Sequence, residues 1–204
     1  TPVAKLEPVA IGGVTVSSIS IHNEEYIREK DLRLGDQVLI ERAGDVIPQI
    51  VKSLTDARNG SEQPIVFPRN CPICQHTLHK EPEEAVWRCG NWECPAQAVE
   101  RIIHFVSKDA LDIRGFGEAN IRKFFESGLL KDIPEIYQLD YEKIGTMEGF
   151  GKKSIEKLQQ SIDASKSQPL HRMLYGLGIR FVGETTAKAI ARNITQLLDL
   201  KDKS

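Results

Sequence analysis

Cys71-Pro-Ile-Cys74 and Cys89-Gly-Asn-Trp-Glu-Cys94 hold all four cysteines of this 204-residue chain, in two closely spaced pairs. Short spacing within each pair lets four thiolates converge on one tetrahedral ion, and this chemistry suits Zn²⁺. Because protein donors would fill all four positions, no position remains for a water nucleophile, and the expected zinc is structural. The ion would supply folding energy to a segment that has few apolar residues of its own.

Three other interpretations of the cysteines are weaker. A disulfide framework needs an oxidising compartment, and the opening Thr1-Pro2-Val3 does not have the order of a secretory signal. His76 or His79 could replace one cysteine as a zinc ligand. An iron–sulfur cluster is possible, but its usual cysteine spacings differ from these.

The residues before the cysteines have the pattern of short strands. Val14-Thr-Val16 and Val38-Leu-Ile40 are β-branched or aliphatic, and glycine-rich turns separate such segments. Short strands at intervals of about 10 residues predict a small antiparallel β-barrel. Because the first residues already look like part of a strand, we expect the chain to be a piece of a larger protein.

The residues after the cysteines have helical periodicity. Pro95 suits a first helical position, and Val99, Ile102, Ile103 and Val106 mark one face of a helix over 95–106. Further helices with glycine-bearing turns continue to the end. The predicted fold class is therefore a multi-domain protein of α and β structure: a β-barrel at 1–68, a four-cysteine zinc finger at 69–95 and an all-α domain at 96–204.

An internal repeat runs through the helical part. Ile113-Arg-Gly-Phe-Gly117 and Met147-Glu-Gly-Phe-Gly151 share one pattern, and Ile179-Arg-Phe-Val-Gly183 keeps only its last glycine. The last glycines are 34 and 32 residues apart. Leu174-Tyr-Gly-Leu-Gly178 also fits, but a helix starting there would pass through Gly183, so we place the third repeat at Gly183. A fourth copy would fall beyond Ser204.

A glycine turn before a helix favours phosphate binding, because the backbone can approach a ligand closely and the helix offers unpaired N–H groups. These strings lack the third glycine of a dinucleotide fingerprint and the spacing of a P-loop. They match the helix-hairpin-helix motif, which holds the DNA backbone without reading sequence. Turns that need glycine only for geometry are the alternative. The predicted DNA contacts are Gly115, Gly117, Gly149, Gly151 and Gly183, with charge from Arg122, Lys152, Lys153 and Lys188.

The net charge and the hydropathy of the chain limit the kinds of partner that it can bind. With 27 basic and 29 acidic residues the net charge is −2, so no broad positive field is available. Residues 171–204 are mildly basic, with six basic and three acidic residues. No apolar run approaches the length of a membrane span, so a membrane partner is not expected.

The order of these units resembles bacterial NAD⁺-dependent DNA ligase, and the resemblance covers essentially the whole chain. It implies an OB-fold at 1–68 that binds the minor groove of nicked DNA, with Arg42, Val46 and Ile47 at the groove. Ordinary core packing is the alternative for Val46 and Ile47. The matching strings are Thr1–Val9, His22-Asn23, Arg42-Ala-Gly-Asp-Val-Ile-Pro48, Cys94-Pro-Ala-Gln97, Leu111-Asp-Ile113 and Leu174–Arg180.

The resemblance also implies that the catalytic lysine belongs to another domain of the polypeptide. The family's catalytic lysine lies in a Lys-x-Asp-Gly string of an adenylation domain, and this sequence contains no such string. We expect a C-terminal fragment that clamps nicked duplex DNA for joining of the 5′-phosphate and 3′-hydroxyl in replication and repair, and that is inactive alone. An adenylation domain of the same polypeptide would use NAD⁺ and Mg²⁺, neither of which is expected to bind here. The implied location is the bacterial cytoplasm, at the nucleoid.

Two other functions compete with the ligase. One is a non-catalytic module whose zinc unit and helices bind protein. The other is a nuclease or repair subunit that uses the same hairpins for DNA, which the lack of a clustered acidic metal site weakens.

Overall fold

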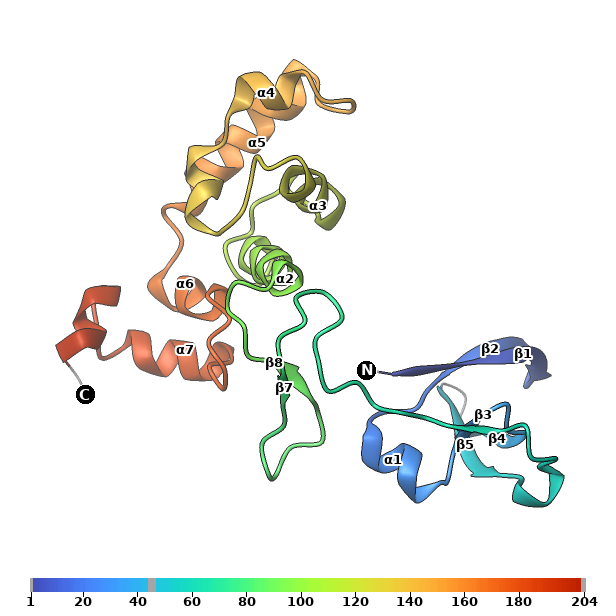
Figure 1. The fold of residues 1–204 in the computed structure, drawn as a ribbon. Coiled ribbons are helices and arrows are strands. Elements are labelled where there is room, and N and C mark those ends of the chain that lie inside the picture. The colour runs from blue at the N-terminus through green and yellow to red at the C-terminus, as the bar shows by residue number, and fades with distance from the viewer. Residues whose placement is uncertain (1, 44–46, 203–204) are drawn as a thin grey trace. The chain divides into compact units, whose positions relative to one another are not determined.

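The computed structural model describes residues 2–43 and 47–202 (Figure 1). It divides the chain into two compact units, 1–91 and 92–204, and each is described by itself. Within the described ranges, no helix has both the length and the apolar character that crossing a lipid bilayer requires.

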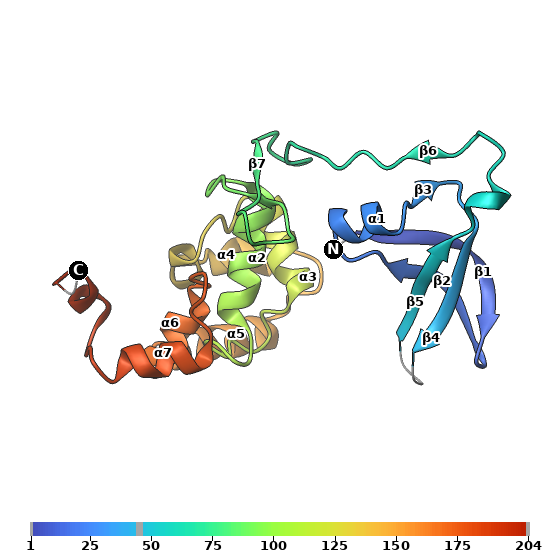
Figure 2. The same cartoon turned by 90° about the horizontal axis from the view of Figure 1, so that it is seen from below.

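The first unit contains pairs of antiparallel strands, and β2 packs against β5 (Figure 2). The strands pair as β1 (Val3–Ile11) with β2 (Val14–Ser20), β4 (Val38–Ala43) with β5 (Ile47–Ser53), and β3 (Arg33–Leu34) with β6 (Gln63–Pro64). The predicted strands at 14–16 and 38–40 are confirmed. The β1–β2 turn needs left-handed backbone, with φ of 56° at Gly12 and 80° at Gly13, which explains the glycine pair. Side chains of β2, of β5 and of the segment that links β2 to β3 enclose one apolar core: Val16, Ile19, Ile21, Ile27, Leu32 and Ile50.

Helix α1 (Glu24–Glu29) covers this core and was not predicted from the sequence. The Asn23 side chain caps it, since its Oδ1 accepts a hydrogen bond from the Tyr26 backbone N at 2.9 Å. The Tyr26 hydroxyl donates to the carbonyl of Ile50 in β5 at 2.8 Å. An asparagine followed by two glutamates was the available signal, because both cap and charge favour a helix N-terminus there.

An arginine clamp fixes the chain after β5. Arg58 follows a 3₁₀ turn (Thr55–Ala57), and its Nε lies 2.7 Å from Asp36 Oδ1. Its Nη1 lies 2.6 Å from Asp31 Oδ2, and its Nη2 donates to the carbonyl of Asp31. The Asp36 side chain is almost fully buried, so this carboxylate depends on Arg58 for its charge partner.

Acid should weaken this clamp. The hydrogen bond from Arg58 lowers the pKa of Asp36 below the ordinary aspartate value, against the opposing effect of burial. A lowered folded-state pKa means that the stabilisation is present at neutral pH and is lost as the pH falls from about 4 through the folded value. We expect Arg58→Gln to lower the melting temperature at neutral pH, and the difference from the parent to shrink in acid. Thermal denaturation followed by circular dichroism across a pH series measures this, and a pH-independent difference would contradict it.

A short hairpin follows in the same unit. Strands β7 (Leu78–His79) and β8 (Arg88–Cys89) pair antiparallel, and Asn70 forms an isolated bridge with Thr77. Glutamates of α1 bind this hairpin: Glu24 accepts a hydrogen bond from Trp87 Nε1 at 2.7 Å, and Glu25 Oε1 lies 2.6 Å from Lys80 Nζ. The hairpin is thereby attached to α1 by polar contacts.

Helices make up the second unit. The first, α2, spans Pro95–Val106, the range that the sequence predicts, with proline in its first turn. The others are α3 (Glu118–Glu126), α4 (Tyr141–Gly145), α5 (Lys152–Ser165), α6 (Leu170–Gly176) and α7 (Glu184–Ala191), with 3₁₀ turns at Pro134–Gln138 and Leu197–Asp202.

The helices pack around aromatic and aliphatic side chains. Phe105, Phe116 and Phe124 are fully buried in the largest core of the unit, which joins α2, α3 and α5. Helix α6 approaches α2 closely at Gly176, where an added Cβ would lie 2.8 Å from Leu111 Cδ2 and 3.3 Å from Phe105 Cδ2. Glycine is therefore required at 176 by packing rather than by any ligand.

Candidate zinc site and candidate nucleic-acid interface

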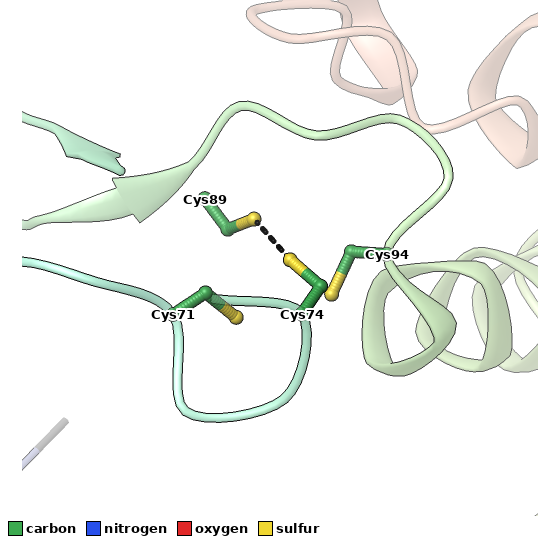
Figure 3. A group of neighbouring side chains, drawn as sticks. All are labelled: Cys71, Cys74, Cys89 and Cys94. Atoms are coloured by element: carbon green, nitrogen blue, oxygen red, sulfur yellow. Dashed lines mark hydrogen bonds between the residues drawn. The ribbon is translucent and has the colours of Figure 1, made fainter. Parts of the chain in front are cut away.

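The four cysteine side chains converge on one point (Figure 3). All four sulfur atoms lie within 4.8 Å of one another, and Cys74 Sγ is 3.5 Å from Cys89 Sγ. Four ligands at zinc–sulfur distances would place the sulfur atoms about 3.8 Å apart around a tetrahedral ion. The donor set and its spacing therefore fit Zn²⁺. Within the described ranges, the donors of this cluster are cysteines, and neither His76 nor His79 belongs to it.

The backbone fixes these thiols locally. The N–H of Cys71 donates to the carbonyl of His76 at 2.8 Å, and the N–H of Gln75 donates to the carbonyl of Cys71 at 2.9 Å. Gln75 has φ of 60°, so the chain folds back sharply just after Cys74. Cys94 is the N-cap residue of α2 and is fully buried. The second pair thus places one ligand on a strand end and the other at a helix start.

The clustered thiols resist ionisation when no metal is bound. Desolvation raises the pKa of Cys89 to about 12, and hydrogen bonds from Cys74 and Cys71 also raise it. A thiol with that pKa is protonated at neutral pH, whereas a coordinating zinc ion deprotonates its ligands. The cluster would therefore bind zinc with release of protons.

The repeat forms three helix-preceding turns, which we call corners: corner 1 (113–117), corner 2 (147–151) and corner 3 (179–183). The middle residue of each has left-handed backbone, with φ of 80° at Gly115, 91° at Gly149 and 65° at Phe181. The last glycine of each is the N-cap of a helix: Gly117 of α3, Gly151 of α5 and Gly183 of α7. The alternative placement of the third repeat fails, because Gly176 lies inside α6.

Neither the backbone angle nor packing requires glycine at the three N-cap positions. Gly117, Gly151 and Gly183 have ordinary φ values of −71°, −87° and −76°, and no side chain caps any of the three helices. A Cβ added at any of them would meet no described atom within 4 Å. Serine, aspartate or asparagine would cap these helices better. The open space at each corner could admit a ligand directly against the backbone.

Aromatic packing holds corners 1 and 2 in one arrangement. The buried Phe124 ring of α3 lies 5.5 Å from the Phe116 ring of corner 1 and 5.0 Å from the Phe150 ring of corner 2 (centroid distances). Lys123 Nζ donates to the carbonyl of Glu148 in corner 2 at 2.5 Å. One helix therefore sets the distance between two of the three corners.

Comparisons with known proteins agree with this architecture. Residues 1–62 match the family model described as the NAD-dependent DNA ligase OB-fold domain. Residues 70–96 match the NAD-dependent DNA ligase C4 zinc finger domain, and residues 172–204 match a helix-hairpin-helix motif.

Curated relatives extend the match over the whole chain. A DNA ligase of Persephonella marina is 63% identical over 204 residues, which is 100% of this chain and 29% of that protein. A DNA ligase of Aquifex aeolicus is 55% identical over 99% of this chain and 28% of its own length, and one of Listeria monocytogenes is 48% identical over 98% and 30%. This chain belongs to the NAD⁺-dependent DNA ligase family. It spans less than a third of the length of these ligases, and the predicted fold class of OB-fold, zinc finger and helix-hairpin-helix units is confirmed.

The predicted cations of this ligase-family chain differ in their surroundings. Lys152 and Lys153 begin α5 directly after corner 2 and are exposed. Lys188 Nζ lies 3.6 Å from Glu184 Oε2 in α7. The Arg122 guanidinium lies 2.7 Å from carboxylate oxygens of both Glu118 and Glu100, so its charge is largely balanced within the chain. Lys152 and Lys153 are therefore the predicted cations that lie closest in sequence to an N-cap glycine, Gly151.

The OB-fold residues assigned by resemblance are only partly described. The Arg42 guanidinium is half-buried and donates from Nη1 to the carbonyl of Gly12 at 2.9 Å, so it braces the β1–β2 turn. Ile47 begins β5 and is 66% exposed, which argues against core packing for this side chain. Val46 lies outside the described residues. A role of these residues at a DNA groove stays a prediction.

The sequence did not predict one polar cluster, which consists of Glu24, Arg69 and Trp87. Arg69 stacks over the Trp87 ring, with its guanidinium carbon 4.2 Å from the centroid, and its Nη2 lies 2.8 Å from Glu24 Oε1. The hydrogen bond that Glu24 accepts from Trp87 has the largest effect on its pKa and lowers it. The hydrogen bond from Arg69 also lowers the pKa of Glu24. Glu24 is 45 positions from Arg69 and 63 from Trp87, and no local spacing in the sequence signals this cluster.

Proposed function

We propose that this chain is the part of an NAD⁺-dependent DNA ligase that grips duplex DNA around a nick. A separate adenylation domain of the same polypeptide would perform nucleotidyl transfer with NAD⁺ and Mg²⁺, passing AMP to the 5′-phosphate before the 3′-hydroxyl attacks. The single observation that carries the proposal is the set of three unexplained N-cap glycines.

The three N-cap glycines leave open space at the helix N-termini. Neither backbone conformation nor packing requires glycine at Gly117, Gly151 or Gly183. A ligand that approaches the backbone at these positions would account for the absence of a side chain. Helix N-termini bind anions through free N–H groups and the helix dipole, and a phosphodiester strand presents such anions at regular intervals. Lys152 and Lys153 add positive charge at corner 2.

The zinc finger has a supporting role in this proposal. Cys71, Cys74, Cys89 and Cys94 would hold one structural Zn²⁺, which supplies folding energy and takes no part in joining. Ile47 at the start of β5 would contribute an apolar contact to the DNA minor groove, as the family resemblance implies. The chain alone would be inactive in sealing, and activity would require the adenylation domain. The proposed location is the bacterial cytoplasm, in replication and repair of the chromosome.

Serine at the N-cap positions should separate DNA binding from folding. We expect Gly151→Ser to raise the stability of α5 by a few tenths of a kcal/mol, because serine caps a helix better than glycine. The same change should weaken binding to nicked duplex about tenfold, because the new side chain keeps the phosphate from the backbone N–H groups. Fluorescence anisotropy with labelled nicked and intact duplexes, across a salt series, measures the affinity.

Asp140→Ala is the matched control for this experiment. Asp140 caps α4 through a hydrogen bond from Lys143 N at 3.1 Å, at a helix N-terminus that has no glycine corner, seven residues before corner 2 begins. It should lower stability and leave DNA affinity unchanged. The parent chain should lose affinity steeply as salt rises, because phosphate contacts release counterions. A parent that shows no binding at low salt would refute the proposal and favour a protein-binding module.

A further inference from the structure

Corner 3 differs from the other two at its middle position. Phe181 occupies the place of Gly115 and Gly149 and has the same left-handed backbone, with φ of 65°. Left-handed backbone is strained for a residue with a Cβ, and glycine avoids this strain. Phenylalanine has no side-chain hydrogen bond to offset the strain, unlike the asparagine or aspartate often found there.

The Phe181 side chain does not contribute to the core. It is 82% exposed, and its neighbour Ile179 is 46% exposed. In corner 1 the apolar residues Ile113 and Phe116 are both buried. The packing role of Phe116 is taken in corner 3 by Val182, which lies against the core of α6 and α7. Folding therefore does not explain an exposed aromatic ring at a strained position.

The surroundings of the ring indicate its ligand. The Arg180 guanidinium carbon lies 4.8 Å from the centroid of the Phe181 ring. A cation beside an exposed apolar ring suits a surface that is both anionic and apolar, and a DNA minor groove has these properties, with phosphates at its edges and sugars and bases inside. Residues 171–204 have an excess of basic side chains, which complements the same ligand.

We infer that the third corner contacts DNA through the Phe181 ring, which enters the minor groove, rather than through a glycine backbone as at corners 1 and 2. The inference rests on the proposed function and names a positioning residue for the same DNA. The ring would lie against sugars or base edges while Arg180 faces a phosphate. Corner 3 would then add apolar contact that depends little on salt.

Substitution of Phe181 by glycine tests this inference, because it should raise the melting temperature and lower the affinity for DNA. Phe181→Gly should raise the melting temperature by about 3 °C, because the strained backbone is relieved. The same variant should bind nicked duplex about tenfold more weakly, as expected when one aromatic contact to a nucleic acid is removed. The slope of log affinity against log salt should not change, because the ring carries no charge. Thermal denaturation and fluorescence anisotropy of the 204-residue chain provide the two measurements.

Three further variants make the outcome decisive. Phe181→Ala should weaken binding as much as glycine does without raising the melting temperature, and Phe181→Trp should retain most of the affinity. Leu198→Ala removes another exposed apolar side chain of the second unit and should leave binding unchanged. If the parent chain binds DNA and Phe181→Gly binds equally well, the inference is overturned and the proposed function stands. If the parent does not bind at low salt, both fall.

Discussion

Loss of the zinc ligands should have the largest effect on this chain. Cys94→Ser replaces a fully buried sulfur donor by a poor zinc ligand at the N-cap of α2. We expect the zinc content to fall from about one ion per chain to near zero and the segment over residues 70–94 to unfold. Structural zinc contributes on the order of 10 kcal/mol of apparent binding free energy to such segments, more than their few apolar contacts provide. Metal analysis after gel filtration and proton NMR of the segment measure the two losses.

His76→Ala is the matched control for the zinc prediction. His76 lies inside the finger, and its carbonyl accepts a hydrogen bond from Cys71 N, a contact that alanine preserves. Its side chain is not in the cysteine cluster, so zinc should stay bound at one ion per chain. Zinc loss in His76→Ala together with retention in Cys94→Ser would show that the ligand set is wrong.

Truncation of Phe124 should give the second large effect. Its ring is fully buried between Phe116 of corner 1 and Phe150 of corner 2. We expect Phe124→Ala to destabilise the helical unit by about 3–5 kcal/mol, through lost burial and an unfilled cavity. DNA binding should weaken as well, because the spacing of the two corners is no longer fixed. Urea denaturation followed by far-ultraviolet circular dichroism measures the stability, and anisotropy measures the binding.

Phe125, the residue after Phe124, provides the control variant for this prediction. Phe125 lies on the same helix and is only partly buried against the core. Phe125→Ala removes the same atoms but should cost clearly less stability and should leave the relation between the corners intact. Equal losses in both variants would mean that α3 contributes only general packing.

Much of the fold could be predicted because its signals are local. The proline at 95 and the apolar spacing after it define α2 to the residue, and the cysteine spacing defines the zinc finger without any knowledge of its surroundings. The glycine at 183 was enough to place the third repeat, since a helix rarely continues through an interior glycine.

The remaining features depend on contacts between distant residues. The clamp joins Arg58 to Asp36 across 22 positions, and the Trp87 hydrogen bond reaches Glu24 across 63 positions. Nothing in the local sequence marks the partners of either pair. The family resemblance places Arg42 at a DNA groove, which stays a prediction, and nothing in the local sequence signals that its Nη1 donates to the Gly12 carbonyl. That Phe181 is strained and exposed follows only from its backbone angle and surroundings, because the sequence pattern there simply lacks a glycine.

The positions of the two tryptophans have a practical consequence. Trp87 donates to Glu24 beside the β7–β8 hairpin, and Trp92 lies between the last two cysteines with the Arg101 guanidinium 4.1 Å from its ring. These are the only tryptophans in the chain, so its intrinsic indole emission originates entirely from the zinc finger. An emission scan would report metal loss optically and without any label. It would be insensitive to the helices around the corners, whose unfolding needs a different spectroscopic probe.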